Sequence, residues 1–308
     1  NRSFQSCYLE KKDTDVYFVN LINNTDIDYS RYKFFYVNYL ISKNKFDEIE
    51  EIVNEIDTLS STLLVLQLKN WADNNKFKKI TEIFSCKNES DILSEFFFII
   101  ANLYSSQEQY ENSNLFLNIA NFLNPKFRFN TSLIIENNFG NENYKKTKIL
   151  LNRFNKKDEI YYWYKIKKIT QIISQESNQE EAINYINSKF SKIENPSTKI
   201  LFDMGNIAKG FKKYQSSINY YNSVISRIEK NSITYADLLY RRGGSYERLG
   251  KYEDSDKDLL KSLEINKDDA YVLNYLAYSW LERDYKIDTA IQMLDKAYEQ
   301  RSNDPYII

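Results

Sequence analysis

The chain has 308 residues, with 42 basic and 43 acidic side chains, so its net charge is close to zero. This balance argues against a protein that holds nucleic acid or an anionic membrane surface through a strong positive field. Gly (6) and Pro (3) are scarce while 42% of the residues are hydrophobic, which disfavours a turn-rich all-β fold and favours long helices joined by short connections.

Chemistry-bearing residues are few. The chain has no histidine, which removes the commonest general base and the commonest metal ligand. Cys7 and Cys86 lie far apart and match no metal or redox spacing, so we interpret them as buried small apolar side chains and not as a disulfide. The longest apolar run, from Phe96 to Ala101, is far shorter than the roughly 20 residues of a membrane span.

Apolar residues recur with helical spacing from the first residues onward. Residues 1–29 predict a clipped pair of helices, with Tyr8 and Leu9 on the first helix and Phe18 on the second. Further pairs are predicted at about 30–60, 61–93, 94–127, 128–162, 163–197 and 198–231. In the pair at 128–162 we expect the Asn-rich stretch 136–143 to form the turn.

One position in the second helix of each predicted pair recurs every 31 to 38 residues. Its members are Ile49, Ile80, Ser113, Thr147, Ala182, Ser217, Ser255 and Ala290. In most pairs an aromatic residue stands three positions earlier, as Phe46, Phe77, Tyr110, Tyr144, Tyr214 and Tyr252. Chance would not keep so narrow a band of spacings, so the chain is predicted to be built from repeats.

The clearest copies are the two pairs between residues 236 and 304. Gly250 falls in the turn between two helices, where we expect a left-handed or crowded backbone. Gly243 and Gly244 fall inside the first helix, where glycine permits close packing between helices. The last pair carries one inserted residue in its turn.

These residues and their period resemble the tetratricopeptide repeat family over nearly the whole chain, whose unit is about 34 residues long. The resemblance implies an all-α fold, a right-handed α-solenoid of about eight antiparallel helix pairs. We expect a single domain over 1–308, with a clipped unit at 1–29, degenerate repeats at 30–197, better-matching repeats at 198–304 and the start of a further helix at 305–308. The last stretch also resembles large bacterial repeat proteins of alphaproteobacterial type, which leaves bacterial cytoplasm and periplasm both open.

The resemblance implies a non-enzymatic scaffold that binds a peptide or protein in the concave groove lined by the first helices, with no cofactor and no metal. In the last three units, twelve side chains stand at the groove positions: Phe202, Asp203, Asn206, Lys209, Tyr240, Arg241, Glu247, Arg248, Tyr271, Asn274, Tyr275 and Tyr278. Tyr and Arg are the types that dominate binding hot spots. The Lys and Asn pattern with which the family holds a C-terminal carboxylate is absent.

RNA binding and catalysis are the two alternative functions for this chain. Helical hairpins of this length also bind RNA, but that mode needs phosphate neutralisation, which the near-zero charge disfavours. An enzyme without histidine would have to use Asp and Glu side chains for catalysis, and no pair of them has a sequence spacing that predicts a catalytic site. The run Asp254, Asp256 and Asp258 lacks the Gly and Glu spacing of a calcium loop and is interpreted as a solvated helix face.

Both ends of the sequence carry expectations. The sequence begins at Asn1 and not at Met, so we interpret it as processed or trimmed, and a removed signal sequence would fit an association with the cell envelope. At the other end Pro305 to Ile308 would open another helix without a polar cap. We therefore expect that the chain continues, or that a partner covers this end.

Overall fold

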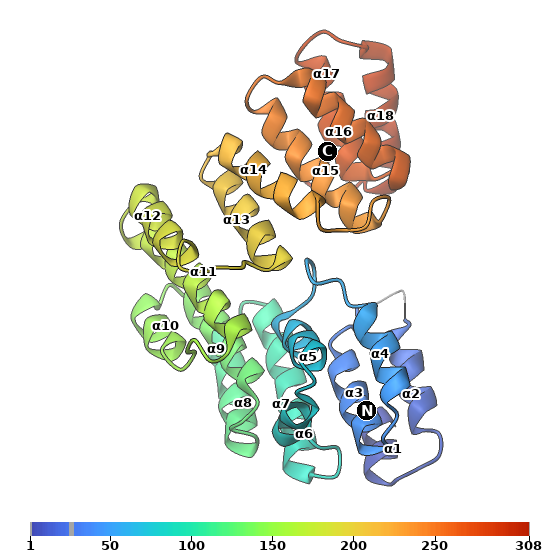
Figure 1. Cartoon of the computed structure of the whole chain (residues 1–308), viewed down its shortest axis with the longest axis vertical. Coiled ribbons are helices and arrows are strands. Elements are labelled where there is room, and N and C mark those ends of the chain that lie inside the picture. The colour runs from blue at the N-terminus through green and yellow to red at the C-terminus, as the bar shows by residue number, and fades with distance from the viewer. Residues whose placement is uncertain (1, 25–27, 308) are drawn as a thin grey trace. The chain divides into compact units, whose positions relative to one another are not determined.

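The computed structural model describes residues 2–24 and 28–307. Over these residues the protein has eighteen α-helices and no strand, and consecutive helices stack as antiparallel pairs (Figure 1). The predicted fold class is confirmed. The chain divides into two compact units, residues 1–186 (unit 1) and 187–308 (unit 2), and each is described by itself. The expectation of one continuous domain stays a prediction.

Each predicted pair corresponds to one observed pair. The helices of unit 1 are α1 (Arg2–Tyr8), α2 (Thr14–Ile22), α3 (Tyr32–Ser42), α4 (Phe46–Asn54), α5 (Leu63–Asp73), α6 (Phe77–Ile83), α7 (Glu89–Ser106), α8 (Tyr110–Leu123), α9 (Arg128–Gly140), α10 (Tyr144–Leu151) and α11 (Glu159–Glu176). Helix α12 (Gln179–Phe190) crosses the division between the units. The helices of unit 2 are α13 (Thr198–Gly210), α14 (Tyr214–Ile225), α15 (Ile233–Glu247), α16 (Tyr252–Ile265), α17 (Ala270–Leu281) and α18 (Ile287–Gln300).

The turn expected at 136–143 was predicted wrongly, because α9 continues to Gly140. Asn137 and Asn138 of α9 are buried, and their side chains form hydrogen bonds inside the fold. Asn137 donates to the hydroxyl of Ser113 at 2.7 Å, and Asn138 donates to the carbonyl of Ile134 at 2.7 Å. These bonds use the side chains that would otherwise compete with a helical backbone. The turn is confined to residues 141–143.

The turn inside most pairs has one recurring backbone form. The residue two positions before the second helix adopts a left-handed conformation, with φ between 53° and 72°, at Asn44, Asn75, Glu108, Glu142, Lys212 and Gly250. The next N–H donates to the carbonyl five residues back, as in Gln109 to Tyr104 at 2.9 Å and Lys251 to Tyr246 at 3.0 Å. This is the Schellman ending of a helix, for which glycine is the least strained residue. Of the two alternatives expected at Gly250, the left-handed backbone is confirmed, and a Cβ there would meet no other atom within 4 Å, so the position is not crowded.

The recurring second-helix position is enclosed in every pair that carries it. All eight residues, from Ile49 to Ala290, are buried. Small residues there let the two helices approach, and glycines on the facing helix do the same. A Cβ on Gly243 would lie 3.0 Å from Leu259, and one on Gly205 would lie 2.6 Å from the Tyr221 ring. The aromatics three positions earlier are less enclosed, since Phe46 is 46% exposed and Tyr252 is 40% exposed.

A disulfide joins Cys7 to Cys86, with their Cα atoms 5.9 Å apart, so the interpretation of the cysteines as unbonded was wrong. Both are buried, as predicted. The separation lies in the ordinary range for such bonds. The bond connects the end of α1 to the segment between α6 and α7. It lies beside a cluster of aromatic rings in which Phe4 contacts Phe35 at 5.1 Å and Phe84 at 5.6 Å.

A buried ion pair also ties distant helices of unit 1 together. Arg31, at the start of α3, donates to Glu95 of α7 at 2.9 Å, and its guanidinium lies 4.1 Å from the centre of the Phe98 ring. The Glu95 side chain is 1% exposed. Burial raises the pKa of this carboxyl to about 7, although the Arg31 charge opposes the shift.

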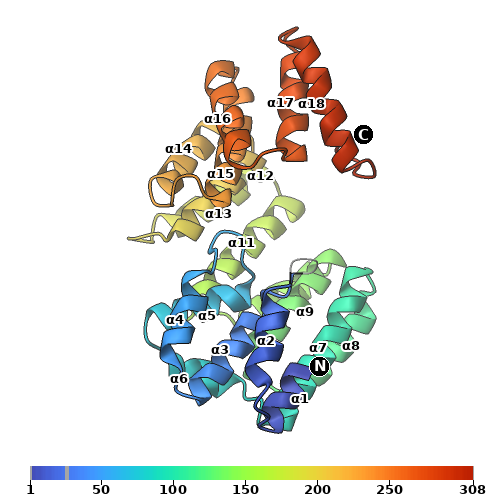
Figure 2. The same cartoon turned by 90° about the vertical axis from the view of Figure 1, so that its right-hand side faces the viewer.

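Helix packing differs between the units. In unit 2, α13 to α18 contact their neighbours in sequence order, and Figure 2 shows α17 and α18 side by side. In unit 1, α3 contacts both α5 and α6, and α5 also contacts α11. Unit 1 is therefore closed by contacts between helices that lie far apart in the sequence.

Candidate functional site

Three helices of unit 2, α13, α15 and α17, carry eleven of the twelve residues predicted to bind a partner, and the twelfth, Arg248, directly follows α15. Each is the first helix of its pair and begins at a side-chain cap. The hydroxyl of Ser197 accepts from the N–H of Ile200, and that of Ser232 accepts from the N–H of Tyr235. Asp269 accepts from the N–H of Tyr271 at 3.0 Å. Such caps satisfy N–H groups that a helix start leaves free and fix where each helix begins.

Polar contacts join α13 to α15. The Asn206 side-chain oxygen accepts from the Tyr221 hydroxyl at 2.7 Å and from Arg241 at 3.4 Å. Arg241 also donates to Asp237, one turn earlier on α15, at 2.8 Å. Lys209 donates to the main-chain carbonyl of Arg241 at 3.3 Å. Three of the predicted residues, Asn206, Lys209 and Arg241, therefore lie together.

Gly244 lets all three helices meet. A Cβ at this position would lie 2.9 Å from the Lys209 amine and 3.3 Å from the Tyr275 hydroxyl, so side chains from α13 and α17 converge over it. Tyr275 packs edge-on against Tyr240 with ring centres 5.8 Å apart, and its hydroxyl donates to Glu247 at 2.9 Å. The close packing expected of glycine here is confirmed.

The charges of this surface are mixed. Burial lowers the pKa of the Lys209 amine to about 8, and the nearby Arg241 and Arg248 charges lower it further. Arg248 lies at the rim with its side chain 58% exposed, and it pairs with Glu247 at 3.4 Å. Cationic and anionic groups thus alternate around the two tyrosines of α15 and α17.

Not every predicted residue is available to a partner. Phe202 and Asp203 are each only 6% exposed, so their assignment as direct contacts needs correction. The Arg241 guanidinium lies 5.3 Å from the Phe202 ring, and Lys199 pairs with Asp203 at 3.3 Å. Both residues support the surface from beneath. Tyr278, by contrast, is 48% exposed.

The end of the described chain lies on the last part of this surface. The Tyr271 hydroxyl donates to Asp304 at 2.6 Å, and the Asn274 amide donates to the Tyr306 carbonyl at 2.9 Å. Residues 305–307 form a turn and not the opening of a helix, which corrects that expectation, and Ile308 lies outside the described residues. Ile307 is buried against Ala270 of α17.

Phe202 and Asp203 are buried, and Tyr271 and Asn274 are bonded to Asp304 and Tyr306 at the end of the described chain. We call the other eight predicted residues the α13–α15–α17 surface: Asn206, Lys209, Tyr240, Arg241, Glu247, Arg248, Tyr275 and Tyr278. Asp237 and Tyr221 hold Arg241 and Asn206 in place and were not predicted from the sequence. Asp237 has a local signal, because a carboxylate four residues before an arginine on a helix is a common ion pair. Tyr221 comes from a second helix and has no such signal.

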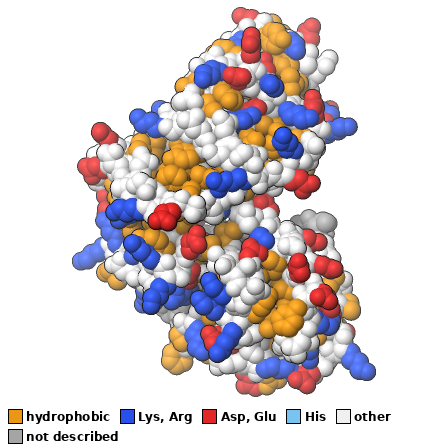
Figure 3. Space-filling view, viewed as in Figure 1, with side chains coloured by type: hydrophobic (Ala, Val, Ile, Leu, Met, Phe, Trp, Pro, Cys, Tyr) orange, Lys and Arg blue, Asp and Glu red, His pale blue; other side chains and the backbone are white. Residues whose placement is uncertain are grey.

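Metal and membrane chemistry were also checked. Among residues 2–24 and 28–307, no three His, Cys, Asp or Glu side chains are grouped so that they could hold a metal ion. None of the described helices has the length and apolar character needed to cross a membrane. Basic and acidic side chains are interspersed over the face seen in Figure 3.

Comparison with known proteins places these observations in context. Residues 236–269 match the family model of the tetratricopeptide repeat. A chain of the APC/C hetero-tetramer Cut9-Hcn1 superposes with a TM-score of 0.50 at 14% identity, covering 99% of this chain and 61% of that one. YrrB, described as a TPR protein with an unusual peptide-binding site, gives a TM-score of 0.33 at 13% identity, covering 68% of this chain and 88% of YrrB. The chain thus spans less than two thirds of the first of these structures. No curated protein matches the sequence.

Proposed function

Because residues 236–269 match the tetratricopeptide repeat model and the described chain folds as stacked helix pairs, we propose that the protein is a non-enzymatic scaffold that binds a peptide or protein on the α13–α15–α17 surface. The observation that carries the proposal is the convergence of Lys209 and Tyr275 over Gly244. It joins side chains of three successive first helices into one continuous patch. Such a patch can contact a ligand that runs across several repeats.

The residue types of the patch suit this role. Tyr and Arg supply large contact area together with directional hydrogen bonds, and they are enriched at binding hot spots. Tyr240, Arg241 and Tyr275 are held by neighbours on adjacent helices. Side chains fixed before binding lose less conformational entropy on binding, which leaves more of the contact energy for affinity. Arg248 and Tyr278 remain exposed at the edge.

Site-specific photo-cross-linking tests the proposal. A cross-linking amino acid replaces Tyr278, and in a matched control it replaces Tyr298, which is 51% exposed on α18. In cells, the Tyr278 position should capture a defined partner that the Tyr298 position does not. Equal capture at both positions, or none at Tyr278, would contradict the proposal.

The recovered partner then allows a quantitative test. Arg248→Ala and Tyr278→Ala should each weaken its binding at least about five-fold, which corresponds to roughly 1 kcal/mol for a hot-spot residue. Arg153→Ala and Tyr298→Ala serve as controls, because both side chains are exposed and lie outside the surface. Calorimetric titration measures the four constants. An equal loss for test and control variants would sink the assignment of this face.

We also infer that the protein works in an oxidising compartment. The support is the bond between Cys7 and Cys86, since disulfides persist mainly where the glutathione and thioredoxin systems do not reduce them. Alkylation of free thiols in freshly lysed cells, followed by mass spectrometry of the peptides that contain Cys7 and Cys86, tests this. Complete alkylation of both cysteines would place the protein in a reducing compartment instead.

A further inference from the structure

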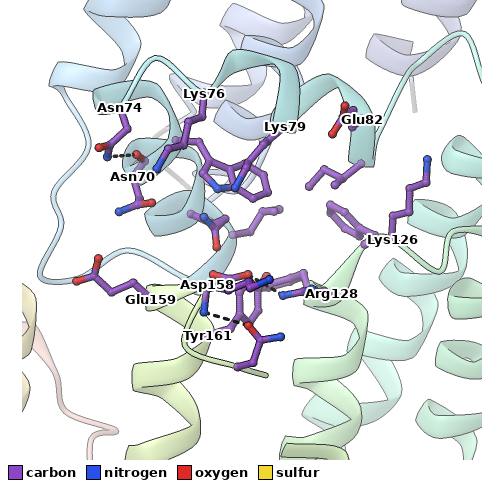
Figure 4. Close-up of a pocket in the computed structure, with 18 of the residues that line it drawn as sticks. Asn70, Asn74, Lys76, Lys79, Glu82, Lys126, Arg128, Asp158, Glu159 and Tyr161 are labelled. Atoms are coloured by element: carbon purple, nitrogen blue, oxygen red, sulfur yellow. Dashed lines mark hydrogen bonds and ion pairs between the residues drawn. The ribbon is translucent and has the colours of Figure 1, made fainter. Parts of the chain in front are cut away.

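A cavity of about 770 Å³ lies within unit 1, away from the α13–α15–α17 surface. It is enclosed by α5, α6 and the segments that lead into α9 and α11 (Figure 4). These segments are brought together by the contact between α5 and α11. The cavity therefore depends on the packing that makes unit 1 irregular, and not on the repeat itself. Its volume lies in the range of small-molecule sites.

The floor of the cavity is polar and internally satisfied. Arg128 pairs with Asp158 at 3.0 Å, and Figure 4 shows the two side chains pointing toward each other. With its amide oriented to satisfy both neighbours, Gln67 donates to Asp158 at 2.6 Å and accepts from the Trp71 indole at 2.8 Å. Gln67 is 3% exposed and Tyr161 is likewise buried. The side chains of the floor are thus held by one another, and the carboxylate of Asp158 is already bonded to Arg128 and Gln67.

The rim is strongly cationic. Five lysines line it, namely Lys76, Lys79, Lys126, Lys156 and Lys157, and all five are exposed. Only two further carboxylates line the cavity, and Glu82 already pairs with Lys78 outside it at 3.8 Å. In the part of the chain that the structure describes, Lys76, Lys126, Lys156 and Lys157 have no ion-pair partner within 4.0 Å. The excess is local, because the whole chain is nearly neutral.

We propose that this cavity binds a small polyanion, a molecule that carries two or more phosphate or carboxylate groups. Five ammonium groups around one opening repel each other, and a bound polyanion removes that repulsion while gaining charge-assisted hydrogen bonds. Three asparagines of the lining, Asn70, Asn74 and Asn155, offer further donors for anionic oxygens. The Trp71 ring and the buried Tyr161 provide a flat apolar part for the remainder of the ligand.

Titration with defined anions tests the proposal. Inorganic triphosphate, citrate and a hexaglutamate peptide are added separately to the full chain at low ionic strength, with heat and Trp fluorescence as readouts. Triphosphate or citrate should bind with a Kd below about 1 mM. Because salt screens the attraction between the lysines and the anion, the affinity should fall at least about ten-fold between 50 and 200 mM salt. Absence of binding by all three anions would overturn the proposal.

Matched variants locate the site. The triple variant Lys79→Gln, Lys126→Gln and Lys156→Gln should lose at least ten-fold in affinity. The control Lys146→Gln, Lys213→Gln and Lys257→Gln changes the net charge equally at exposed lysines elsewhere and should bind as the original chain does. Equal losses in both triples would show a diffuse field and overturn the proposal. Trp71→Phe should remove the fluorescence response while leaving the heat of binding.

The three anions distinguish the source of the anionic groups. Tighter binding of triphosphate or citrate supports a free small molecule, whereas tighter binding of hexaglutamate identifies the acidic side chains of a peptide as the source. A single-stranded oligonucleotide is titrated in parallel. If it bound while triphosphate, citrate and hexaglutamate did not, the cavity would not be the small-polyanion site described here.

Discussion

The two units use the same helix pair but hold it together differently. In unit 2 the second helices α14, α16 and α18 have 12, 14 and 14 residues, and the small residues Ser217, Ser255 and Ala290 stand at the recurring second-helix position. In the first pairs of unit 1, α4 and α6 have only 9 and 7 residues, and Ile49 and Ile80 stand at the same position. The helices of these two pairs also contact each other less extensively than those of the pairs in unit 2.

Unit 1 is stabilised in addition by bonds between residues that lie far apart in the sequence. The disulfide between Cys7 and Cys86 and the ion pair between Arg31 and Glu95 connect helices that the repeat would not bring together. A degenerate repeat can thus be stabilised by links between distant segments. The contact between α5 and α11 is another such link, and it forms the lysine-rimmed cavity, which a regular stack lacks.

The largest effect is expected from removing the disulfide. It closes a loop of 79 residues, for which the chain-entropy estimate is about 4.5 kcal/mol of stability. Reduction, or the double variant Cys7→Ser and Cys86→Ser, should therefore destabilise unit 1 and leave unit 2 unchanged. Hydrogen exchange of peptides from the two units, read by mass spectrometry, separates them. A reductant should have no further effect on the double variant, and equal loss of protection in unit 2 would contradict the contrast between the units.

A smaller effect is expected from the buried carboxyl of Glu95. Its pKa is about 7 in the folded chain, above the ordinary 4.5, so the folded state binds a proton that the unfolded state has released between these values. The stabilisation is complete below about pH 4.5 and is lost as pH rises through 7, by about 3 kcal/mol in all. Chemical denaturation of unit 1 between pH 4.5 and 8 measures it. Glu95→Gln should flatten this part of the profile, and an unchanged slope in that variant would refute the assignment.

The smallest effect concerns the turns that both units share. Glu108→Gly and Glu142→Gly in unit 1, and Lys212→Gly in unit 2, should each stabilise by roughly 0.5 to 1 kcal/mol, because glycine adopts the left-handed backbone without strain. Gly250→Ala should destabilise by a similar amount. Thermal unfolding of the four variants measures these changes. A glycine at Lys146, inside α10, should destabilise and so controls for a general effect of glycine.

The sequence predicted the features that are local to one repeat. The helix pairs follow from the apolar spacing, and the turn at Gly250 follows from the backbone freedom of glycine. Gln179 stands where most second helices begin with an aromatic residue, and the turn before it lacks the left-handed residue found in most other pairs. In each case the interacting groups lie within about one unit of each other.

Features that depend on distant segments were not predictable in this way. The pairing of Cys7 with Cys86 has no local pattern, because it requires α1 to return to the segment after α6. The prediction that Phe202 and Asp203 contact a partner was wrong for a similar reason, because a groove position becomes inaccessible when neighbouring side chains and helices cover it. The lysines around the cavity come from three separate segments, 76–79, 126 and 156–157, and only the fold shows that they surround one opening.

The disulfide also sets how the chain responds to force. Pulling on the two ends can straighten every residue outside the loop, but the 79-residue span between Cys7 and Cys86 stays closed. At about 3.5 Å per residue, that span would otherwise add roughly 270 Å of extended length. The bond thus makes the first three helix pairs a fixed link of short length, so that tension on the oxidised protein is transmitted past them without drawing them out.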